Sequence, residues 1–216
     1  MSLPVFQSAL ARLIVDPDFR DDVRARGGAA LSSDLSCRER ERLLAVCVDP
    51  GLDITRTLHK GFRLGKLLGQ LPLTRLLLDR DTMAKEVGEF WRRRLPVSFY
   101  YLEEALAFCD YLMERVGSGD LEVPYLAEIT SYERATLELQ RSRPAGSEPP
   151  LQAVEFRHDP LPLIGSLARG EVPPAAAERH CWLLGSCENG ALQGHLVPAD
   201  AWPPEGQRPA LAPVTV

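Results

Sequence analysis

Over the first 140 residues, apolar positions recur at the three- and four-residue spacing of amphipathic helices. The first such stripe consists of Phe6, Leu10, Leu13 and Ile14. Asp16 followed by proline is typical of a helix start, and Ser36 with Glu39 forms the pattern of a capping box. The spacing predicts about seven helices with short connections, so this part of the chain is expected to form an all-α bundle.

One predicted helix, beginning near Asp53, has a distinctive pair of features. Ile54, Leu58, Phe62 and Leu68 lie broadly on one side of it. Three glycines follow at a four-residue spacing, namely Gly61, Gly65 and Gly69, and this spacing favours close approach of another helix. Three of the five cysteines, Cys37, Cys47 and Cys109, also lie in helical patterns, and we expect them to pack as small apolar residues.

Beyond residue 150 the apolar positions alternate with a period of two, which indicates β-strands. Strands are predicted over residues 151–156, 180–187 and 191–197, and residues 160–168 are predicted to form a short helix or turn. The last two strands flank Asn189-Gly190, a strong hairpin signal. The predicted fold class is therefore α+β, with a multi-helix bundle followed by a small antiparallel β element of two or three strands.

The prolines divide the chain further. Of the 18 prolines, 12 fall within the last 77 residues. We predict a helical bundle domain over residues 1–140, a linker over 141–150, a small β domain with the hairpin over 151–198 and a proline-rich tail over 199–216. A β element of this size cannot stand alone, so it is expected to pack on the helices or on a partner.

Charge and cysteine usage restrict the classes of function. The chain has 25 basic and 30 acidic residues, a net charge of −5, which argues against general nucleic-acid binding. The basic run Trp91-Arg92-Arg93-Arg94 is best interpreted as a helix C-terminus with partner contacts, and a DNA-binding or regulatory helical protein is the alternative. With no secretion signal and no apolar span of 18 residues, we expect a cytoplasmic protein with reduced thiols and no membrane partner.

The sequence carries no recognisable catalytic or metal motif. His180, Cys181, Cys187 and His195 resemble zinc ligands in kind, but their spacing matches no zinc site and packing is the preferred interpretation. The carboxylates of Glu86, Glu89, Glu103 and Glu104 are expected on solvated helix faces. We therefore predict no catalytic residues and no metal site. A thiol or hydrolytic enzyme stays an alternative, because such sites assemble in space rather than in sequence.

The central helices carry a longer pattern. Between Thr57 and Glu138 the chain contains EFWRRRLPVSFYYLEEALAFCDYLMER and then VPYLAEITSYERATLEL. An FW ahead of a proline, an E-A-L-A-F-x-D-Y-L helix and a later Y-E-x-A resemble the small partner proteins of multinuclear non-heme iron oxidative enzymes. These proteins act in pathways of ribosomally made, modified peptides, and the methanobactin-biosynthesis partner subunit and its thiaglutamate-pathway counterpart belong to them.

The resemblance implies a non-catalytic subunit. It would form a heterodimer with a TIM-barrel oxidase that holds the iron ions, so no cofactor is expected in this chain. It would also capture the leader of a ribosomal precursor peptide, whose cysteine-containing core is then oxidised.

The β hairpin suggests how such a leader is held, since a peptide can add as a strand to a sheet edge. The residues predicted to bind the peptide are His180, Trp182, Leu184, Leu192, Gly194 and Leu196. Trp182 is either the anchor of that site or a core aromatic that fixes the hairpin to the helices. The surface predicted to face the enzyme consists of Phe90, Trp91, Arg92 and Tyr101.

Overall fold

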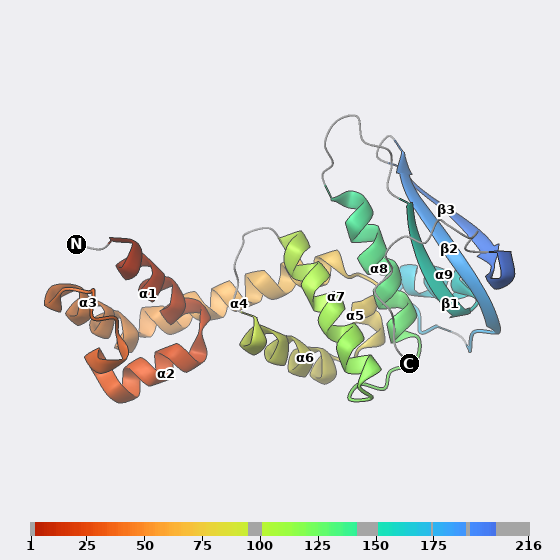
Figure 1. The fold of residues 1–216 in the computed structure, drawn as a ribbon. Helices are drawn as coiled ribbons and strands as arrows, with labels where there is room; N and C mark the ends of the chain where they lie inside the picture. The colour runs from red at the N-terminus through yellow and green to blue at the C-terminus, as the bar shows by residue number, and fades with distance from the viewer. Residues whose placement is uncertain (1–2, 95–100, 142–150, 174, 189–190, 202–216) are drawn as a thin grey trace. The chain divides into compact units, whose positions relative to one another are not determined.

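The computed structural model describes residues 3–94, 101–141, 151–173, 175–188 and 191–201. Helices dominate the N-terminal part and a three-stranded antiparallel sheet follows, which confirms the predicted α+β class (Figure 1). The chain divides into two compact units. Unit 1 comprises Met1–Lys66 with Trp91–Phe99, and unit 2 comprises Leu67–Phe90 with Tyr100–Val216.

Unit 1 is helical. Its elements are α1 (Leu3–Val15), α2 (Pro17–Arg26), the 3₁₀ turn η1 (Gly27–Ala30), α3 (Cys37–Val48) and the first part of α4 (Pro50–Gln70). The predicted caps are present: the Asp16 carboxylate accepts the N–H of Phe19 at 3.0 Å, and Ser36 with Glu39 forms the capping box. The core of the unit is built from Leu13, Val23, Leu35, Leu43 and Cys47 among others.

An aromatic cluster joins two helices of unit 2. The helices that precede the sheet in this unit are α5 (Thr74–Leu77), α6 (Arg80–Arg93) as far as Phe90, α7 (Tyr101–Gly117) and α8 (Leu126–Gln140). The Phe90 ring lies 5.1 Å from the Phe108 ring and 5.6 Å from the Tyr111 ring, between centroids. Aromatic pairs at this separation add to the stabilisation from apolar burial, so they fix α6 on α7.

The sheet has the strand order β1-β2-β3. Strand β1 (Leu151–His158) leads into helix α9 (Pro160–Ala168), and β2 (Glu178–Glu188), β3 (Ala191–Pro198) and the turn η2 (Ala199–Ala201) follow. Helix α9 starts as its sequence dictates, because Asp159 accepts the N–H of Leu161 at 3.2 Å and Pro160 occupies the first turn. The helix-or-turn alternative at residues 160–168 is thus settled as a helix.

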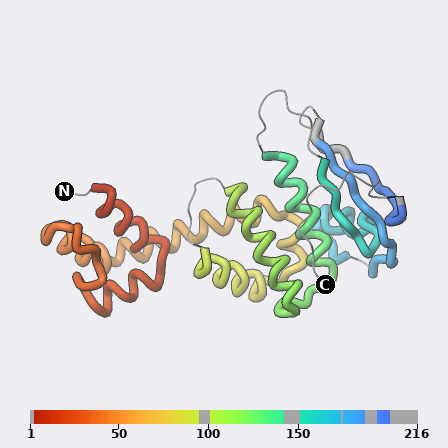
Figure 2. Tube along the Cα trace, in the orientation of Figure 1, coloured from red at the N-terminus to blue at the C-terminus, as the bar shows by residue number. Residues whose placement is uncertain are grey.

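One face of the sheet packs on α8 and α9 (Figures 1 and 2). The buried cluster includes Ile129 of α8, Leu163 and Leu167 of α9, and three sheet residues: Val154, Phe156 and Cys181. We call this side the inner face of the sheet and the opposite side its outer face. Because the inner face is covered by helices, the strand residues available to a ligand are those on the outer face and at the sheet edges.

The division into units differs from the predicted domains. The helices do not form one domain over residues 1–140, and the sheet shares unit 2 with α7, α8 and other helices. The physical reason is that three strands bury an apolar face only against other elements, and α8 and α9 supply that surface. Residues 142–150 of the predicted linker and 202–216 of the predicted tail lie outside the described residues.

Candidate functional site at the sheet edge

The position of each strand decides where a peptide could pair. Strand β2 is central: its residues 181–186 pair with β1 on one side and with β3 on the other. Its main-chain donors and acceptors are therefore already used, and no further strand can add along β2. Of the six residues predicted to bind the peptide, the first three lie on β2, and only Leu192, Gly194 and Leu196 belong to an edge strand.

The other edge strand, β1, is partly covered by α8. One carboxylate oxygen of Glu128 accepts the N–H groups of Arg157 and His158 at 2.5 and 3.1 Å, and the other lies 3.0 Å from His158 Nδ1. The Tyr125 ring also meets the His158 ring edge to face, 4.9 Å between centroids. An irregularity in the pairing between Phe156 and His158 accompanies these contacts. A peptide would have to displace them, so β1 is the poorer acceptor.

Strand β3 is the better acceptor. Within the described residues its ladder partners all lie in β2, from Ala191 opposite Glu188 to Pro198 opposite Cys181. In an antiparallel ladder about half of the peptide groups of an edge strand point away from its neighbour. Gly194 and His195 are exposed, and Leu196 and Val197 are half-buried. The edge of β3 thus offers main-chain donors and acceptors beside side chains of mixed character.

The register assigns each side chain to a face. Val154, Leu183 and Leu196 lie opposite one another across the three strands and belong to the inner face with its buried cluster. The neighbouring row consists of Glu155, Trp182 and Val197, which therefore lie on the outer face. Trp182 is half-buried there. The interpretation of Trp182 as a core aromatic that fixes the sheet to the helices is wrong, since α8 and α9 pack on the other face.

The six residues predicted to bind the peptide do not form one surface. His180, Trp182 and Leu184 are on the outer face of β2. Gly194 and Leu196 are on the inner face of β3, and Leu196 packs against the buried cluster. Leu192 pairs with Cys187 in the register, and its side chain lies outside the described residues. The sequence interpretation took every second residue of both strands but did not fix which faces these residues share.

Three outer-face residues were missed by the sequence prediction: Glu155, His195 and Val197. Glu155 holds His180, with 2.6 Å between Oε1 and Nε2. Its position between the apolar residues Val154 and Phe156 was a usable signal, because strict alternation places it on the opposite face. His195 and Val197 pair with Leu184 and Trp182 in the register, so the outer face presents apolar, imidazole and carboxylate groups together.

The suspected zinc ligands are separated by the sheet. Cys181 is buried on the inner face, whereas His180 and His195 lie on the outer face. Burial raises the pKa of the Cys181 thiol, which disfavours the thiolate that a metal needs. Among the described side chains, no group of three or more His, Cys, Asp or Glu residues is placed to hold a metal ion.

The predicted enzyme-facing surface is partly wrong. Phe90 is only 2% exposed, because it belongs to the aromatic core of unit 2. Trp91 is half-buried, and the Arg63 guanidinium lies 4.5 Å from its ring centroid. Arg92 is exposed and lines a hollow of about 420 Å³ with Arg12, Asp16, Asp18, Phe19 and Asp22. Trp91 and Arg92 belong to unit 1 and Tyr101 to unit 2, so the four residues are not one continuous surface of either unit.

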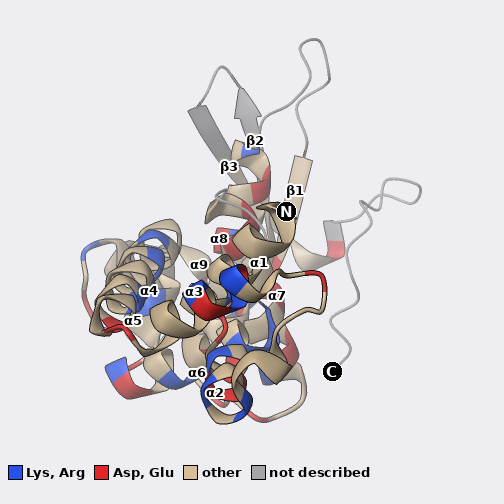
Figure 3. Ribbon diagram, turned by 90° about the vertical axis from the view of Figure 1, so that its left-hand side faces the viewer, with Lys and Arg blue, Asp and Glu red and all other residues tan. Residues whose placement is uncertain are grey.

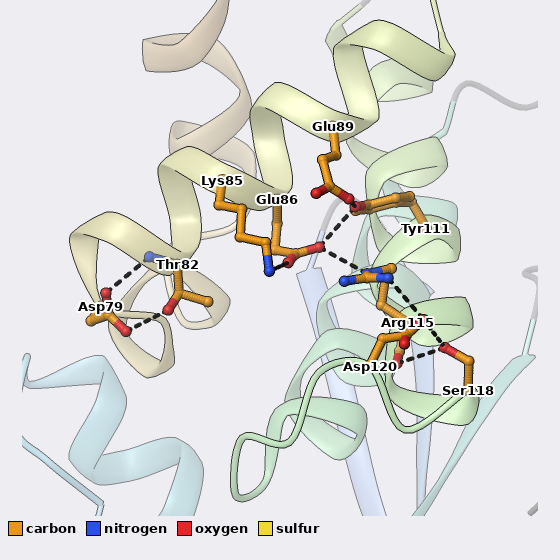
Figure 4. A network of polar contacts seen from close by, with 9 residues as sticks. All are labelled: Asp79, Thr82, Lys85, Glu86, Glu89, Tyr111, Arg115, Ser118 and Asp120. Atoms are coloured by element: carbon orange, nitrogen blue, oxygen red, sulfur yellow. Dashed lines mark hydrogen bonds and ion pairs between the residues drawn. The ribbon is translucent and has the colours of Figure 1, made fainter.

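A buried polar network in unit 2 was also missed (Figure 4). The side chain of Glu86 was expected in solvent but is 1% exposed. It accepts a hydrogen bond from the Tyr111 hydroxyl at 2.7 Å and one from Arg115 Nε at 3.1 Å. Burial and the neighbouring Glu86 carboxylate raise the pKa of the Tyr111 hydroxyl. The tyrosine therefore stays protonated as the donor that joins α7 to α6, which is a structural role.

The cysteines allow a direct test of the thiol-enzyme alternative. Cys37 is exposed, against expectation, while Cys47, Cys109 and Cys181 are buried. Burial, with help from the Glu133 carboxylate, raises the pKa of the Cys109 thiol. We expect a maleimide probe to modify Cys37 at least tenfold faster than these three thiols in the folded protein, as mapped by mass spectrometry. A buried cysteine that outpaces Cys37 would favour a thiol enzyme instead.

Charge along the helices is mixed. Figure 3 shows basic and acidic positions interspersed along α2 and α6. The exposed Arg92 shares its hollow with three aspartates, which oppose the binding of an anion such as a nucleic-acid phosphate.

Within the described ranges, none of the helices has the length and apolar character that crossing a bilayer requires. No protein-family model and no curated protein sequence matches the chain.

Proposed function

We propose that this chain is a non-catalytic partner subunit that captures a peptide by strand addition to β3. The supporting observation is that β3 is an edge strand, while β2 is paired on both sides and the other edge strand, β1, is covered at one end by Glu128. Strand addition takes its affinity from main-chain hydrogen bonds and its specificity from alternate side chains.

The side chains around β3 indicate how a bound peptide is read. An added strand would place alternate residues beside His195 and Val197 on the outer face, with Trp182 one strand further in. The remaining residues would pass the inner face next to Leu196. One series of peptide positions should therefore be aromatic or aliphatic, since it meets Trp182 and Val197. A dissociation constant in the micromolar range, about −8 kcal/mol, is enough for delivery to an enzyme.

The resemblance of residues 57–138 supplies the biological half of the proposal. The captured peptide is the leader of a cysteine-containing ribosomal precursor, and the enzyme that receives it is a multinuclear iron oxidase bound as a heterodimer. The oxidative chemistry belongs to that enzyme, and this chain contributes binding alone. The proposal predicts that a gene for such an oxidase lies beside the gene of this chain, and co-expression of the two should give a complex that co-purifies. Two folded proteins that fail to associate would refute this half of the proposal.

The peptide site has its own test, by hydrogen exchange on the full chain with a synthetic leader, taken from the precursor gene that the proposal predicts beside the gene of this chain. With saturating leader we expect amides of residues 194–197 to exchange at least tenfold more slowly, and those of residues 153–156 in β1 to change little. Protection of β1 alone, or of neither strand, would contradict the assignment.

A pair of variants separates the two edges. Val197→Lys puts a charge beside the added strand and should weaken leader binding about tenfold in a fluorescence-anisotropy titration. Leu151→Lys makes the same change at an exposed apolar position of β1 and should leave the affinity within a factor of two. Equal losses in both variants would point to a general effect on the sheet, and the assignment to β3 would fail.

A further inference from the structure

Strand β3 lacks the features that usually protect an edge strand from pairing with another chain. The other edge strand, β1, exposes the charged side chains of Glu155 and Arg157, and its pairing is irregular between Phe156 and His158. Residues 191–198 of β3 include no Asp, Glu, Lys or Arg, and they pair with β2 without interruption. A regular, uncharged edge strand of this kind readily accepts a further strand.

We infer that β3 of one copy of this chain pairs with β3 of a second copy, antiparallel and about a two-fold axis. The other strands of a second copy are poorer partners, because β2 is paired on both sides and β1 carries the charges and the irregularity just described. An antiparallel pair of identical strands exchanges main-chain hydrogen bonds in both directions, and here it sets no like charges against each other. Such an isologous contact is closed at two copies.

The helices beneath the sheet leave this edge open. Their cover decreases from β1 to β3: Val154 and Phe156 are buried, whereas Leu183 and Leu196 are half-buried. Helix α8 packs on β1 and β2 (Figure 1). A second sheet can therefore approach β3 in the plane of the first without meeting α8. Leu196 lies at the seam between the two sheets, where the second copy covers its remaining exposed surface.

Two residues of β3 determine the register of the pair. Facing residues on antiparallel strands share a face of the sheet, so the two-fold axis passes through a residue and not between two. An axis at Gly194 pairs residues 191–197 of the two copies and leaves Pro198, which has no N–H to donate, outside the paired segment. An axis at His195 would bring the two imidazoles face to face and draw Pro198 into the pairing. The axis at Gly194 is therefore preferred.

A single pair of strands gives a small contact. An interface below about 1,200 Å² is in the range of weak and transient association, so we expect a dissociation constant on the order of 100 µM. The second copy and the leader of the proposed function use the same edge and exclude each other. That consequence rests on the proposed function, whereas the dimer itself does not.

Sedimentation equilibrium of the full chain from 5 to 500 µM tests the association, and the natural chain should dimerise over this range. A Cβ at Gly194 would meet Leu183 Cδ1 at an ordinary contact distance of 3.5 Å, so this position accepts a side chain. Gly194→Lys sets two like charges against each other at the axis and should weaken the dimer at least tenfold, while Gly194→Thr should not. Leu151→Lys, at an exposed position of β1, should also leave the dimer unchanged.

The outcomes of this experiment separate the dimer from the peptide site. A chain that stays monomeric at 500 µM, or a dimer that Gly194→Lys and Leu151→Lys weaken alike, overturns the inference. Protection of residues 194–197 by the leader, measured at 5 µM chain where the dimer is dissociated, tests the proposed function separately. Circular dichroism of each variant establishes that it is folded.

Cross-linking tests the register, in a chain whose Cys37 and Cys187 are replaced by serine. Gly194→Cys lies on the two-fold axis, so diamide should oxidise its thiol and that of the second copy to a disulfide-linked dimer. Val197→Cys lies further along β3, and the antiparallel register separates the two copies of this thiol by about 20 Å. Cross-linking of position 197 as fast as position 194 would exclude this arrangement.

Discussion

Replacing Glu86 by alanine should lower the free energy of unfolding of unit 2 by about 3–5 kcal/mol, the cost of breaking a buried ion pair from one side. Glu86 accepts both the Tyr111 hydroxyl and the Arg115 Nε, and the Arg115 side chain is itself largely buried (Figure 4). Without the carboxylate, α7 keeps a guanidinium and a hydroxyl in the interior with fewer partners. Urea titrations, in which the hydrogen exchange of the α7 amides reports unfolding, measure this loss of stability.

The size of that effect has two internal checks. Glu122→Ala removes an exposed glutamate and should change the free energy of unfolding by no more than about 0.5 kcal/mol. Adding Arg115→Ala to Glu86→Ala should cost less than the sum of the two single changes, because it removes the guanidinium that has lost its buried partner and keeps only the exposed Asp120. If Glu86→Ala resembles Glu122→Ala, the network contributes nothing and α6 is held to α7 by the aromatic cluster alone.

The local signals in the sequence were reliable. The Asp16 cap, the Ser36 capping box and the Asn-Gly hairpin depend on contacts within a few residues, and the structure contains each of them or the strands it joins. The prediction of which side of a helix is buried was less reliable. Phe90 and Trp91 are adjacent, hence about 100° apart around α6, and only the packing of α7 shows that Phe90 is the buried one.

The candidate site depended on the contacts that sequence reasoning reaches least. The hairpin between β2 and β3 was predictable, but that β2 is the central strand follows from the pairing of Phe156 with Cys181, 25 residues apart. That pairing decided which strand is an edge and which face Trp182 occupies. The sequence also showed that Ile54, Leu58 and Phe62 lie on one side of α4. It did not show that this side is exposed, because a pattern of apolar residues does not say what covers them.

The Y-E-x-A motif that carries part of the resemblance has a structural explanation. Its glutamate, Glu133, is buried in α8 and accepts the N–H groups of Leu73 and Thr74 at 2.6 and 2.8 Å. These are the donors at the start of α5 that the helix itself leaves unpaired. Tyr132 and Ala135 pack against the cluster under the sheet. The motif therefore describes how α5, α8 and the sheet fit together.

Glu133→Leu should consequently destabilise unit 2 by about 3 kcal/mol, since it leaves two buried N–H groups without acceptors. The pH dependence is more specific. Burial outweighs the hydrogen bonds from Thr74 and Leu73 and raises the pKa of the Glu133 carboxyl, so the folded state holds the proton more tightly than the unfolded state does. This contribution to stability is complete below the unfolded pKa of about 4.3 and is lost as pH rises through the folded pKa.

Glu133→Gln isolates that titration, because it keeps one acceptor and removes the ionisable group. The free energy of unfolding of the natural chain, minus that of Glu133→Gln, should decrease as the pH is raised from 4 to 8 in urea titrations. The matched difference for the exposed Glu122→Gln should stay nearly constant. A difference that increases with pH would mean that the two N–H donors stabilise the carboxylate more than burial destabilises it, and the pKa of the Glu133 carboxyl would then be lowered by folding instead of raised.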